Sequence, residues 1–385
     1  MKEAANPRKL RVGVDARDLL VLQPTGVERV VAHFIEHVVA AADIEIVLFS
    51  DHPLGDRAPR SANYEQVVEP VRHPRLQRLF DHWILVQLRP VLRRHRVDAF
   101  YSLNTKFPLA TVPSFATVHG VEWYFYPQGF RLLERVKQWL WFQLAVRRSA
   151  GIVTFAENTR RDMLRIHPRC DRPMRVVPEG VDPMFRRLAH GERSTALLDR
   201  LGISGAFVLS VCSLVPRKNL DGLMRAFALM QNAAPLSCRL VLVGRSGWRA
   251  DRLKALAAQL GIADRVCFAG YLPDADLVQL YNQARLFVYP SKYEGFGLPP
   301  LEAMACGVPV VTSDRSATAE VARDAAILID PDSDQELAAG MQRGLTDELL
   351  RRRLIAAGLL RSQQYSWPAM TRQIVAFIRA NVQPS

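Results

Sequence analysis

Cysteines are few in this sequence, and none stands in a spacing typical of a disulfide framework or a metal site. Five of the 385 residues are cysteine. Three of these lie in apolar, strand-like runs, where a thiol packs as a small hydrophobic group. We therefore expect neither a disulfide nor a bound metal ion. The five are Cys170, Cys212, Cys238, Cys267 and Cys306.

Long hydrophobic runs are also missing. No apolar stretch approaches the ~18 to 20 residues that a membrane-spanning helix needs. The start of the chain, Met1 to Pro7, lacks the apolar core of a secretory signal peptide. These absences predict a cytoplasmic protein.

Acidic residues are scarce in the first half of the chain. The formal net charge is +13, and between Arg57 and Arg187 we count 23 Lys or Arg against 11 Asp or Glu, a balance of +12. Such a field favours a polyanion or an anionic surface, and nucleic acid and the inner leaflet of a membrane are the two candidates. No aromatic-basic RNA signature and no helix-turn-helix spacing accompanies the charge, so we expect no nucleic-acid partner.

Short β-branched runs alternate with helical patterns along both halves, which favours an α/β fold of two doubly wound domains, each a parallel sheet covered by helices. A length of 385 residues also fits two domains better than one. We predict domains over 1–187 and 198–368, with the linker region in 182–200. The predicted strands are 10–15, 44–49, 97–103, 114–119, 151–155 and 175–177, followed by 207–212, 239–244, 265–270, 284–289, 308–312 and 326–330.

The last part of the chain is predicted to be helical. The pattern runs from Asp334 to Gln364 and breaks around Ser366-Trp367-Pro368. An amphipathic helix over 369–382 follows the break.

Two carboxylates flank a glycine-rich turn between residues 292 and 302. Pro299 and Pro300 suit the first turn of a helix, so Glu294 falls on the preceding loop and Glu302 near the helix start. Backbone N–H groups at this corner suit phosphate oxygens, and the carboxylates suit vicinal hydroxyls, which together is the chemistry of a nucleotide sugar. The alternative is that Glu302 caps its helix and Glu294 is solvated. The N–H groups belong to Gly295, Phe296, Gly297 and Leu298.

The spacing Glu294-x7-Glu302, within Glu-Gly-Phe-Gly-Leu-Pro-Pro-Leu-Glu, resembles the signature of the family-4 retaining glycosyltransferases. These enzymes have the GT-B fold, in which two Rossmann-like domains face a central cleft. The resemblance extends over essentially the whole chain and is most specific between 208 and 331. It implies that Glu294 approaches the hydroxyls of the donor sugar and that Glu302 binds the ribose. It also implies that the C-terminal helix, 369–385, packs back on the first domain.

A second motif places two cations after the strand predicted at 207–212. Fixed positive charge there would stabilise a departing diphosphate without a metal ion. Lys218 matches the family's diphosphate-binding lysine. Ser213 stands where the family often has an arginine, so Arg217 is the candidate for the second cation. The alternative is a solvated basic turn.

Four loops carry the remaining candidate residues, each assigned by the resemblance. His119 ends the strand predicted at 114–119, where the family has a histidine that contacts the donor sugar. Near the N-terminus, Thr25 and Gly26 precede a helix and would border the phosphate and the acceptor. Gly244, Tyr271 and Leu272 stand in two loops that surround the nucleotide. A structural histidine and ordinary turns are the alternatives.

Two helical runs, 76–96 and 131–148, mix aromatic and basic residues. Basic amphipathic helices bind anionic headgroups, at ~1 kcal/mol for each cation near the surface. Both runs also lie where a sheet needs a covering layer, so core packing is the alternative. Together with the charge excess, they lead us to expect peripheral contact with the inner face of the plasma membrane.

These features predict a metal-independent retaining glycosyltransferase that moves a hexose from a nucleoside-diphosphate donor to a hydroxyl of a saccharide or lipid-linked saccharide, with α configuration. No cofactor is expected beyond that co-substrate. The motif is similar to that of mannosyltransferases that use GDP-mannose in bacterial polysaccharide and lipopolysaccharide assembly. A UDP-sugar-dependent glucosyl or N-acetylglucosaminyl transferase is the alternative. A nucleic-acid-binding module and a catalytically silent scaffold are alternatives from other classes.

Overall fold

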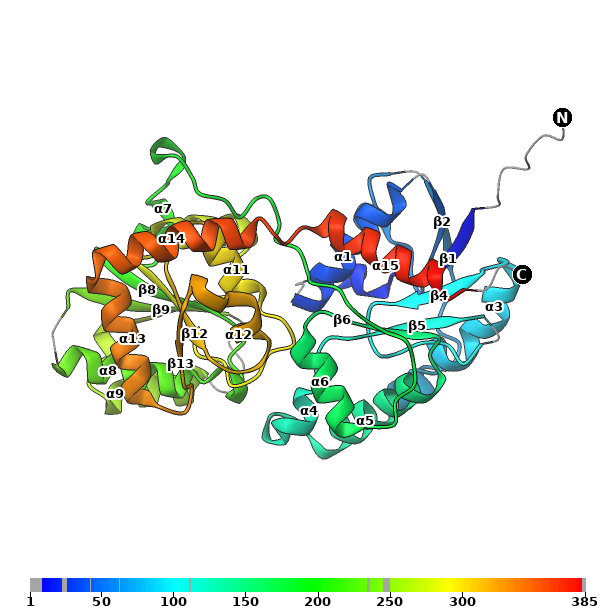
Figure 1. Cartoon of the computed structure of the whole chain (residues 1–385), viewed down its shortest axis with the longest axis horizontal. Helices are drawn as coiled ribbons and strands as arrows, with labels where there is room; N and C mark the ends of the chain where they lie inside the picture. The colour runs from blue at the N-terminus through cyan, green and yellow to red at the C-terminus, as the bar shows by residue number, and fades with distance from the viewer. Residues whose placement is uncertain are drawn as a thin grey trace. The chain divides into compact units, whose positions relative to one another are not determined.

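A computed structural model describes residues 9–22, 26–41, 43–61, 63–110, 112–233, 236–244 and 250–382. The chain forms two compact units, each built on its own sheet (Figure 1). The first unit contains the described residues of Met1–Val121, Leu132–Glu179 and Trp367–Ser385, and the second contains Glu122–Arg131 and Gly180–Ser366.

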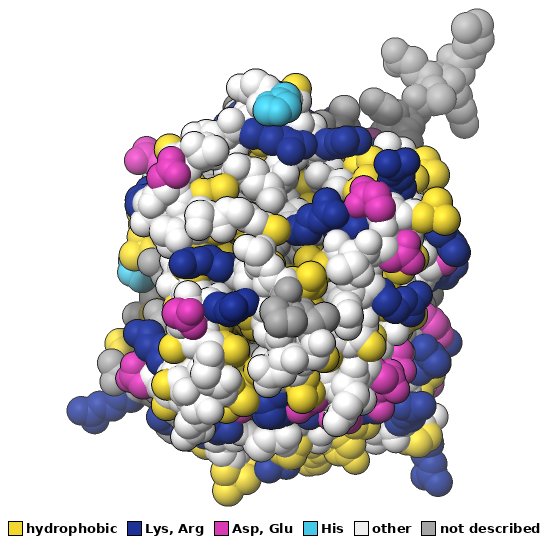
Figure 2. All heavy atoms as spheres, turned by 90° about the vertical axis from the view of Figure 1, so that its left-hand side faces the viewer, with side chains coloured by type: hydrophobic (Ala, Val, Ile, Leu, Met, Phe, Trp, Pro, Cys, Tyr) yellow, Lys and Arg dark blue, Asp and Glu magenta, His cyan; other side chains and the backbone are white. Residues whose placement is uncertain are grey.

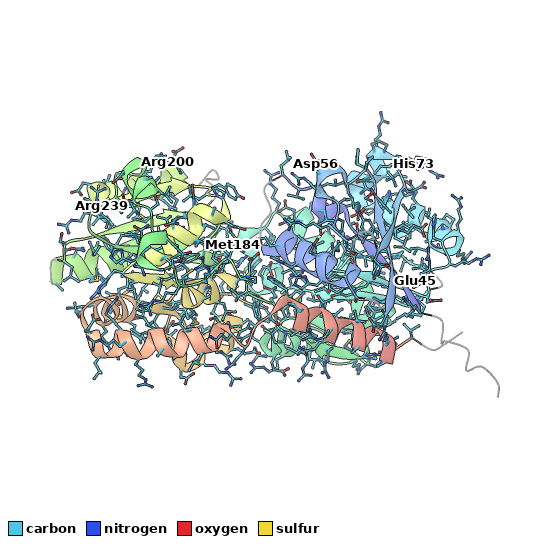
Figure 3. All side chains as sticks on the ribbon, turned by 90° about the horizontal axis from the view of Figure 1, so that it is seen from above. Glu45, Asp56, His73, Met184, Arg200 and Arg239 are labelled. Carbon is cyan, nitrogen blue, oxygen red and sulfur yellow. The ribbon has the colours of Figure 1, made fainter. Side chains whose placement is uncertain are left out.

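The first unit is a parallel α/β sheet in the order β3-β2-β1-β4-β5-β6-β7. Ion pairs connect the three strands β1, β2 and β3 at one side of this sheet. Arg11 of β1 contacts Glu45 of β2 at 2.9 Å and also Glu65 of β3 (Figure 3 labels Glu45). The strands are β1 (Leu10–Asp15), β2 (Ile44–Ser50), β3 (Tyr64–Val68), β4 (Ala99–Ser102), β5 (Ser114–Val118), β6 (Gly151–Thr154) and β7 (Met174–Val176). The helices are α1 (Gly26–Val39), α2 (Pro74–Phe80), α3 (Leu88–Arg94), α5 (Leu132–Arg148), α6 (Glu157–Ile166) and α15 (Trp367–Ala380).

The second unit is a six-stranded parallel sheet in the order β10-β9-β8-β11-β12-β13. Its core packs apolar residues of the central strands against α8 and α13. The strands are β8 (Ala206–Val211), β9 (Cys238–Val243), β10 (Val266–Gly270), β11 (Leu286–Tyr289), β12 (Val310–Ser313) and β13 (Ile327–Ile329). The helices are α4 (Glu122–Phe125), α7 (Ala196–Arg200), α8 (Leu220–Ala233), α9 (Ala250–Gln259), α10 (Asp274–Gln283), α11 (Leu298–Ala305), α12 (Ser316–Ala322), α13 (Asp334–Thr346) and α14 (Glu348–Ser362).

The predicted α/β architecture is confirmed, and each predicted strand exists within about two residues of its expected bounds. Strand β3 was not predicted. Its sequence, Tyr-Glu-Gln-Val-Val, alternates polar and apolar residues too little to indicate a strand, and an edge position tolerates that composition.

The helical run predicted over 76–96 is interrupted. Helix α2 ends at Phe80 because Asp81 adopts a left-handed conformation with φ of 51°. Arg17 and Lys106 hold the Asp81 carboxylate at 2.9 Å and 3.1 Å. A π-helical turn, Trp83–Gln87, then leads into α3.

The domain borders differ from the predicted ones. The border after the first unit follows Glu179 rather than residue 187, and the short segment Glu122–Arg131 belongs with the second unit. The interruption of the helical pattern, expected around 366–368, lies earlier. Helix α14 ends at Ser362, and Trp367 and Pro368 already begin α15. Proline suits this first turn, where its missing N–H group has no helical partner.

Helix α15 returns to the first unit, as the resemblance implied, and lies beside α1 (Figure 1). The Trp367 ring stacks on His33, with ring centroids 4.5 Å apart. Farther along, Arg379 forms an ion pair with Asp43 at 2.6 Å. The last helix therefore completes the first unit.

None of the helices in the described ranges combines the length and the hydropathy that a membrane crossing requires. Figure 2 shows one face of the second unit, where basic side chains are interspersed with acidic ones. This mixed face fits the sequence count, which puts most of the positive excess in the first half of the chain.

Replacing Trp367 by alanine should destabilise the first unit, because the buried indole ring joins α15 to α1. We expect a loss of about 3 to 5 kcal/mol in the free energy of unfolding, measured by chemical denaturation. Leu349→Ala is the control, since Leu349 is 81% exposed and its truncation should change stability by less than about 0.5 kcal/mol. Equal stability of the two variants would contradict the proposed role of α15.

Candidate functional site

The two strands at the centre of the second sheet place the candidate site. Strands β8 and β11 are neighbours in space, with Leu286 beside Val208, although they are far apart in the chain. The strand order reverses between them, and in open parallel sheets ligands bind at the carboxyl ends of the strands at such a point. The loop after β8 carries Lys218, and the loop after β11 carries Glu294.

The glycine-rich turn has the predicted form. Helix α11 begins at Leu298, with Pro299 and Pro300 in its first turn. Gly297 precedes the helix with φ of 120°, a conformation that other residues rarely adopt, and an added Cβ there would lie 3.2 Å from Thr318 Cγ2. The turn therefore needs glycine at this position. Phe296 and Leu298 are buried beside it.

Glu294 is buried and accepts three polar contacts on one oxygen. Lys218 Nζ lies 2.6 Å from Glu294 Oε1, and Arg217 Nη1 lies 2.8 Å from the same atom. Ser291 Oγ donates a third hydrogen bond to it. The sequence motif put Glu294 on a loop, but the solvated alternative does not hold, since the side chain is 9% exposed.

Lys218 and Arg217 are held in place from several sides. A 3-10 turn, Pro216–Lys218, presents both residues after β8. Lys218 also donates to Tyr289 Oη at 2.6 Å, and its Nζ lies 5.0 Å from the centroid of that ring. Arg217 also donates to the carbonyl oxygen of Tyr293 at 3.0 Å. The interpretation of this motif as a solvated basic turn is therefore wrong for Lys218, which is buried.

The charges in this cluster shift each other's protonation. Burial raises the pKa of Glu294, but the charges of Arg217 and Lys218 outweigh it and lower that pKa to about 2. Burial and the charge of Arg217 lower the pKa of Lys218 against the pull of Glu294. Burial opposes the charge of Arg217, yet the carboxylates of Glu294 and Glu122 raise its pKa above the ordinary value. Glu294 is therefore ionised at neutral pH, and two cations share it.

Glu302 lies in the second turn of α11 and is also buried, at 2% exposure. Tyr281 Oη of α10 donates to Glu302 Oε2 at 3.0 Å. The two glutamates of the motif thus face different partners: Glu294 meets cations, and Glu302 meets a phenol hydroxyl.

The two loops expected around the nucleotide follow β9 and β10. Gly244 N–H donates to the Gly270 carbonyl at 2.8 Å, which joins the two loops. A Cβ on Gly244 would lie 1.8 Å from the Cys212 carbonyl oxygen, so packing alone already requires glycine there. Leu272 is buried, whereas Tyr271 is 42% exposed. The residues that follow Gly244 in the motif, 245–248, lie outside the described residues.

His119 and Gly26 belong to the first unit. His119 follows β5, its Nε2 lies 2.6 Å from the Leu103 carbonyl oxygen, and its ring packs edge-on against Phe155. Gly26 is the first residue of α1 and is exposed. Thr25 lies outside the described residues.

Several residues of the site were not found from the sequence. Tyr289, Ser291 and Tyr293 contact the charged cluster, and they stand just before the motif that begins at Glu294, so its spacing does not reveal their roles. The larger omission is the segment Glu122–Arg131, which stands far from the motif in the chain. Its run of aromatic residues was the feature of the sequence that could have indicated a role in the site.

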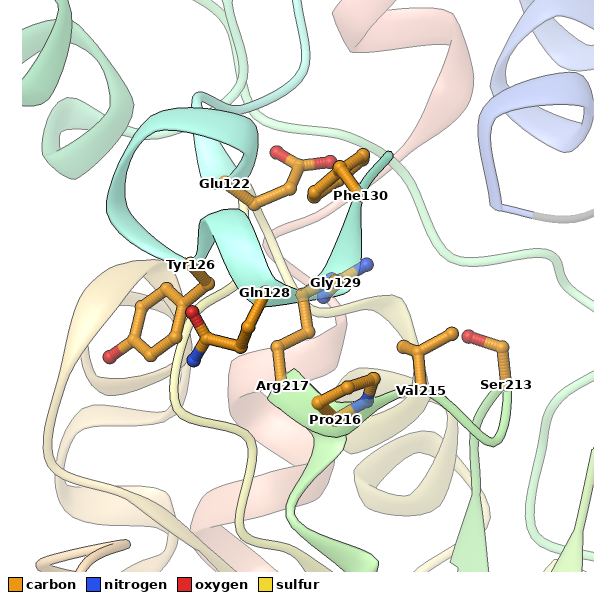
Figure 4. Close-up of a pocket in the computed structure, with 9 residues that line it drawn as sticks. All are labelled: Glu122, Tyr126, Gln128, Gly129, Phe130, Ser213, Val215, Pro216 and Arg217. Atoms are coloured by element: carbon orange, nitrogen blue, oxygen red, sulfur yellow. The ribbon is translucent and has the colours of Figure 1, made fainter. Parts of the chain in front are cut away.

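That segment and the loop after β8 enclose a pocket of about 220 Å³ (Figure 4). Figure 4 shows the Arg217 side chain extending from its loop toward Gly129 and Phe130. The pocket is lined by Glu122, Tyr126, Gln128, Gly129 and Phe130 from the segment, and by Ser213, Val215, Pro216 and Arg217 from the loop.

The cysteines and acidic residues of the described ranges show no metal-binding arrangement. All five cysteines are free thiols. Within the described part of the chain, no group of three or more His, Cys, Asp or Glu side chains is arranged to hold a metal ion.

Comparison with known proteins gives two family matches, one in each half of the chain. The model "Glycosyltransferase Family 4" matches residues 24–185, and the model "Glycosyl transferases group 1" matches residues 202–361. Among curated relatives, the O-antigen chain mannosyltransferase B of Escherichia coli is 40% identical over 169 residues, which are 44% of this chain and 44% of that protein. The match thus spans less than half the length of that relative.

Solved structures share the fold over nearly the whole chain. The sucrose-phosphate synthase of Thermosynechococcus elongatus has a TM-score of 0.76 at 20% identity, covering 97% of this chain and 99% of that one. Anabaena Alr3699/HepE, solved in complex with UDP-glucose, has a TM-score of 0.74 at 19% identity, covering 96% and 100%. The chain thus carries glycosyltransferase domains of the family 4 type in its first half and of the group 1 type in its second half, on the fold of the GT-B glycosyltransferases.

Proposed function

We propose that the protein transfers a hexose from a nucleoside-diphosphate sugar to a hydroxyl of a saccharide or lipid-linked saccharide, with retention of the α configuration and without a metal ion. The observation that carries this proposal is the shared carboxylate oxygen of Glu294, which two cations contact within 2.8 Å. Lys218, Arg217 and Glu294 leave one positive charge in excess, and an anionic diphosphate would balance it.

In the proposed reaction these residues act on opposite ends of one bond. As the bond between sugar and diphosphate breaks, negative charge grows on the phosphate oxygens, and Lys218 and Arg217 would stabilise it. Backbone N–H groups of residues 295–298, at the start of α11, would add hydrogen bonds to the same oxygens. Glu294 would accept hydrogen bonds from hydroxyls of the donor sugar.

The other assigned residues complete the proposed site. Glu302 would bind the ribose hydroxyls, and Tyr281 would orient its carboxylate. The loops at Gly244 and at Tyr271 and Leu272 would surround the base. In the first unit, His119 would contact the donor sugar, while Thr25 and Gly26 would border the phosphate and the acceptor. The departing phosphate would take the proton of the acceptor hydroxyl.

We favour GDP-mannose as the donor. The relative that is 40% identical is named an O-antigen chain mannosyltransferase, and the motif around Glu294 resembles that of GDP-mannose-dependent enzymes. A UDP-sugar is the alternative, since the HepE structure holds UDP-glucose in the same fold. At 19% identity, the similarity to HepE supports a shared fold and not a shared donor.

We further propose that α5 rests on an anionic membrane surface. Five apolar side chains follow helical spacing along one exposed face, with exposures from 45% to 73%, while Trp141, Phe142 and Val146 pack inward. Two basic residues in the last turn of the helix, Arg147 and Arg148, would attract anionic headgroups. The five exposed residues are Leu132, Leu133, Val136, Trp139 and Leu140.

The donor assignment predicts which nucleotide stabilises the protein. GDP and GDP-mannose should raise the melting temperature more than UDP, dTDP, ADP or their sugars, because a ligand that binds only the folded state stabilises it. Glu302→Gln should weaken nucleotide affinity about tenfold to a hundredfold, the loss expected for one hydrogen bond to a charged group. A larger shift with UDP would favour the alternative donor, and no shift with any nucleotide would contradict the proposed activity.

Glu294→Gln should lower turnover about a hundredfold to a thousandfold, since the amide keeps the shape of the side chain but loses its charge. The variant should also melt at a lower temperature, because Lys218 and Arg217 lose their buried counter-charge, so activity is measured well below that temperature. Asp264→Asn, which removes an exposed carboxylate of the same unit, serves as the control. If turnover of Glu294→Gln matched that of the control, the sugar-site role would be wrong.

The membrane proposal predicts binding to vesicles of phosphatidylcholine with phosphatidylglycerol at low salt. The variant Leu132→Gln/Leu133→Gln/Val136→Gln should lose most of this binding in a sedimentation assay, because it removes apolar area from the exposed face. Leu349→Gln/Leu360→Gln, on the exposed surface of α14, should bind like the unmodified protein. Absence of binding by the unmodified protein, or equal binding by the α5 variant, would refute the proposal.

A further inference from the structure

The pocket beside Arg217 is built by a segment that the first half of the chain contributes to the second unit. Its anchors are aromatic rings and one hydrogen bond. Tyr126 Oη donates to the Lys292 carbonyl at 3.1 Å, and the rings of Phe125 and Tyr126 lie 5.8 Å and 5.9 Å from that of Tyr293. Lys292 and Tyr293 directly precede Glu294. The segment is therefore fastened to the loop that carries the buried carboxylate.

The pocket adjoins the charged cluster through one shared side chain. Arg217 lines the pocket, and its Nη1 contacts Glu294 Oε1 at 2.8 Å. A ligand group in the pocket would thus lie next to the group that Glu294 binds.

The charged groups of the pocket disfavour an anionic ligand. Glu122 supplies one negative charge and Arg217 one positive charge, and the two interact, since Glu122 helps to raise the pKa of Arg217. Arg217 also contacts Glu294, so the Glu122 carboxylate adds a negative charge on the pocket side that disfavours a phosphate there. Ser213 and Gln128 add a hydroxyl and an amide, and Phe130 and Tyr126 add aromatic walls (Figure 4). Such a lining suits a neutral ligand with many hydroxyls.

Size limits the ligand further. Pockets that hold drug-sized ligands measure roughly 300 to 1,000 Å³, whereas this one measures about 220 Å³. It has room for a single ring and not for a whole nucleotide.

We infer that this pocket binds one saccharide ring, with Glu122 accepting hydrogen bonds from its hydroxyls and thereby acting as a specificity-determining residue. The inference rests on the proposed function and deepens it. The ring comes from one of two sources, the sugar of the nucleotide donor or the terminal sugar of the acceptor. Both present the same hydroxyl chemistry.

The test compares Glu122→Gln with the unmodified protein in two titration experiments. The first measures the dissociation constants of GDP and GDP-mannose, or of UDP and UDP-glucose if that pair binds the unmodified protein. The second measures binding of methyl α-mannoside with saturating nucleoside diphosphate present. Asp264→Asn is again the control, because its exposed carboxylate precedes the amino end of the edge strand β10, whereas the pocket lies beyond the carboxyl end of the central strand β8.

Glu122→Gln should weaken the sugar-bearing ligand about tenfold in one of the two experiments and leave the affinity for the nucleoside diphosphate within about twofold. A loss confined to the nucleotide sugar identifies the donor sugar as the occupant, and a loss confined to methyl α-mannoside identifies the acceptor. Gln128→Ala, which truncates an exposed side chain of the same pocket, should cause a smaller loss in the same experiment.

Two results would overturn the inference. The pocket does not bind a saccharide ring if Glu122→Gln behaves like Asp264→Asn in both experiments. The same conclusion follows if Glu122→Gln lowers the affinity for the nucleoside diphosphate as much as the affinity for the nucleotide sugar. In either case binding by the unmodified protein would leave the proposed function intact. If the unmodified protein binds no nucleotide and no nucleotide sugar, the proposed function fails and the saccharide pocket fails with it.

Discussion

The buried contact of Lys218 and Arg217 with one oxygen of Glu294 is the interaction on which the candidate site depends. Removing charged groups from water is costly, and a buried ion pair often adds little to stability. Packing therefore does not explain why two cations and a carboxylate meet inside the second unit. A site that must hold an anion next to a hydroxylated ring does need this arrangement, because it requires fixed positive charge beside a carboxylate.

The topology of the sheet brings these residues together. Lys218 and Glu294 are 76 residues apart, yet β8 and β11 pair directly at the point where the strand order reverses. Each strand delivers its loop to the same edge, so the cations after β8 meet the carboxylate after β11. The glycine turn at Gly297 then starts α11 at this edge and buries Glu302 one turn into the helix. Strand order, turn conformation and charge together therefore form the candidate site.

The sequence predicted the fold and the motif residues because both leave local signals. Apolar runs of four to seven residues revealed the central strands, and the prolines after Gly297 revealed the start of α11. Strand β3 was not predicted because an edge strand needs no continuous apolar run. The interruption of the helix at Asp81 was not predicted because the cations that hold this residue are distant in the sequence. The contacts of Glu294 and the packing of the segment Glu122–Arg131 against the second unit could not be predicted either, since both depend on residues that only folding brings close together.

A crystal structure with a bound nucleotide sugar tests the central claim most directly. The account predicts that the diphosphate lies within hydrogen-bond distance of Lys218 and Arg217, and that a hydroxyl of the donor sugar replaces one of the contacts on Glu294. A ligand bound elsewhere, with the contacts among Lys218, Arg217 and Glu294 unchanged, would contradict it.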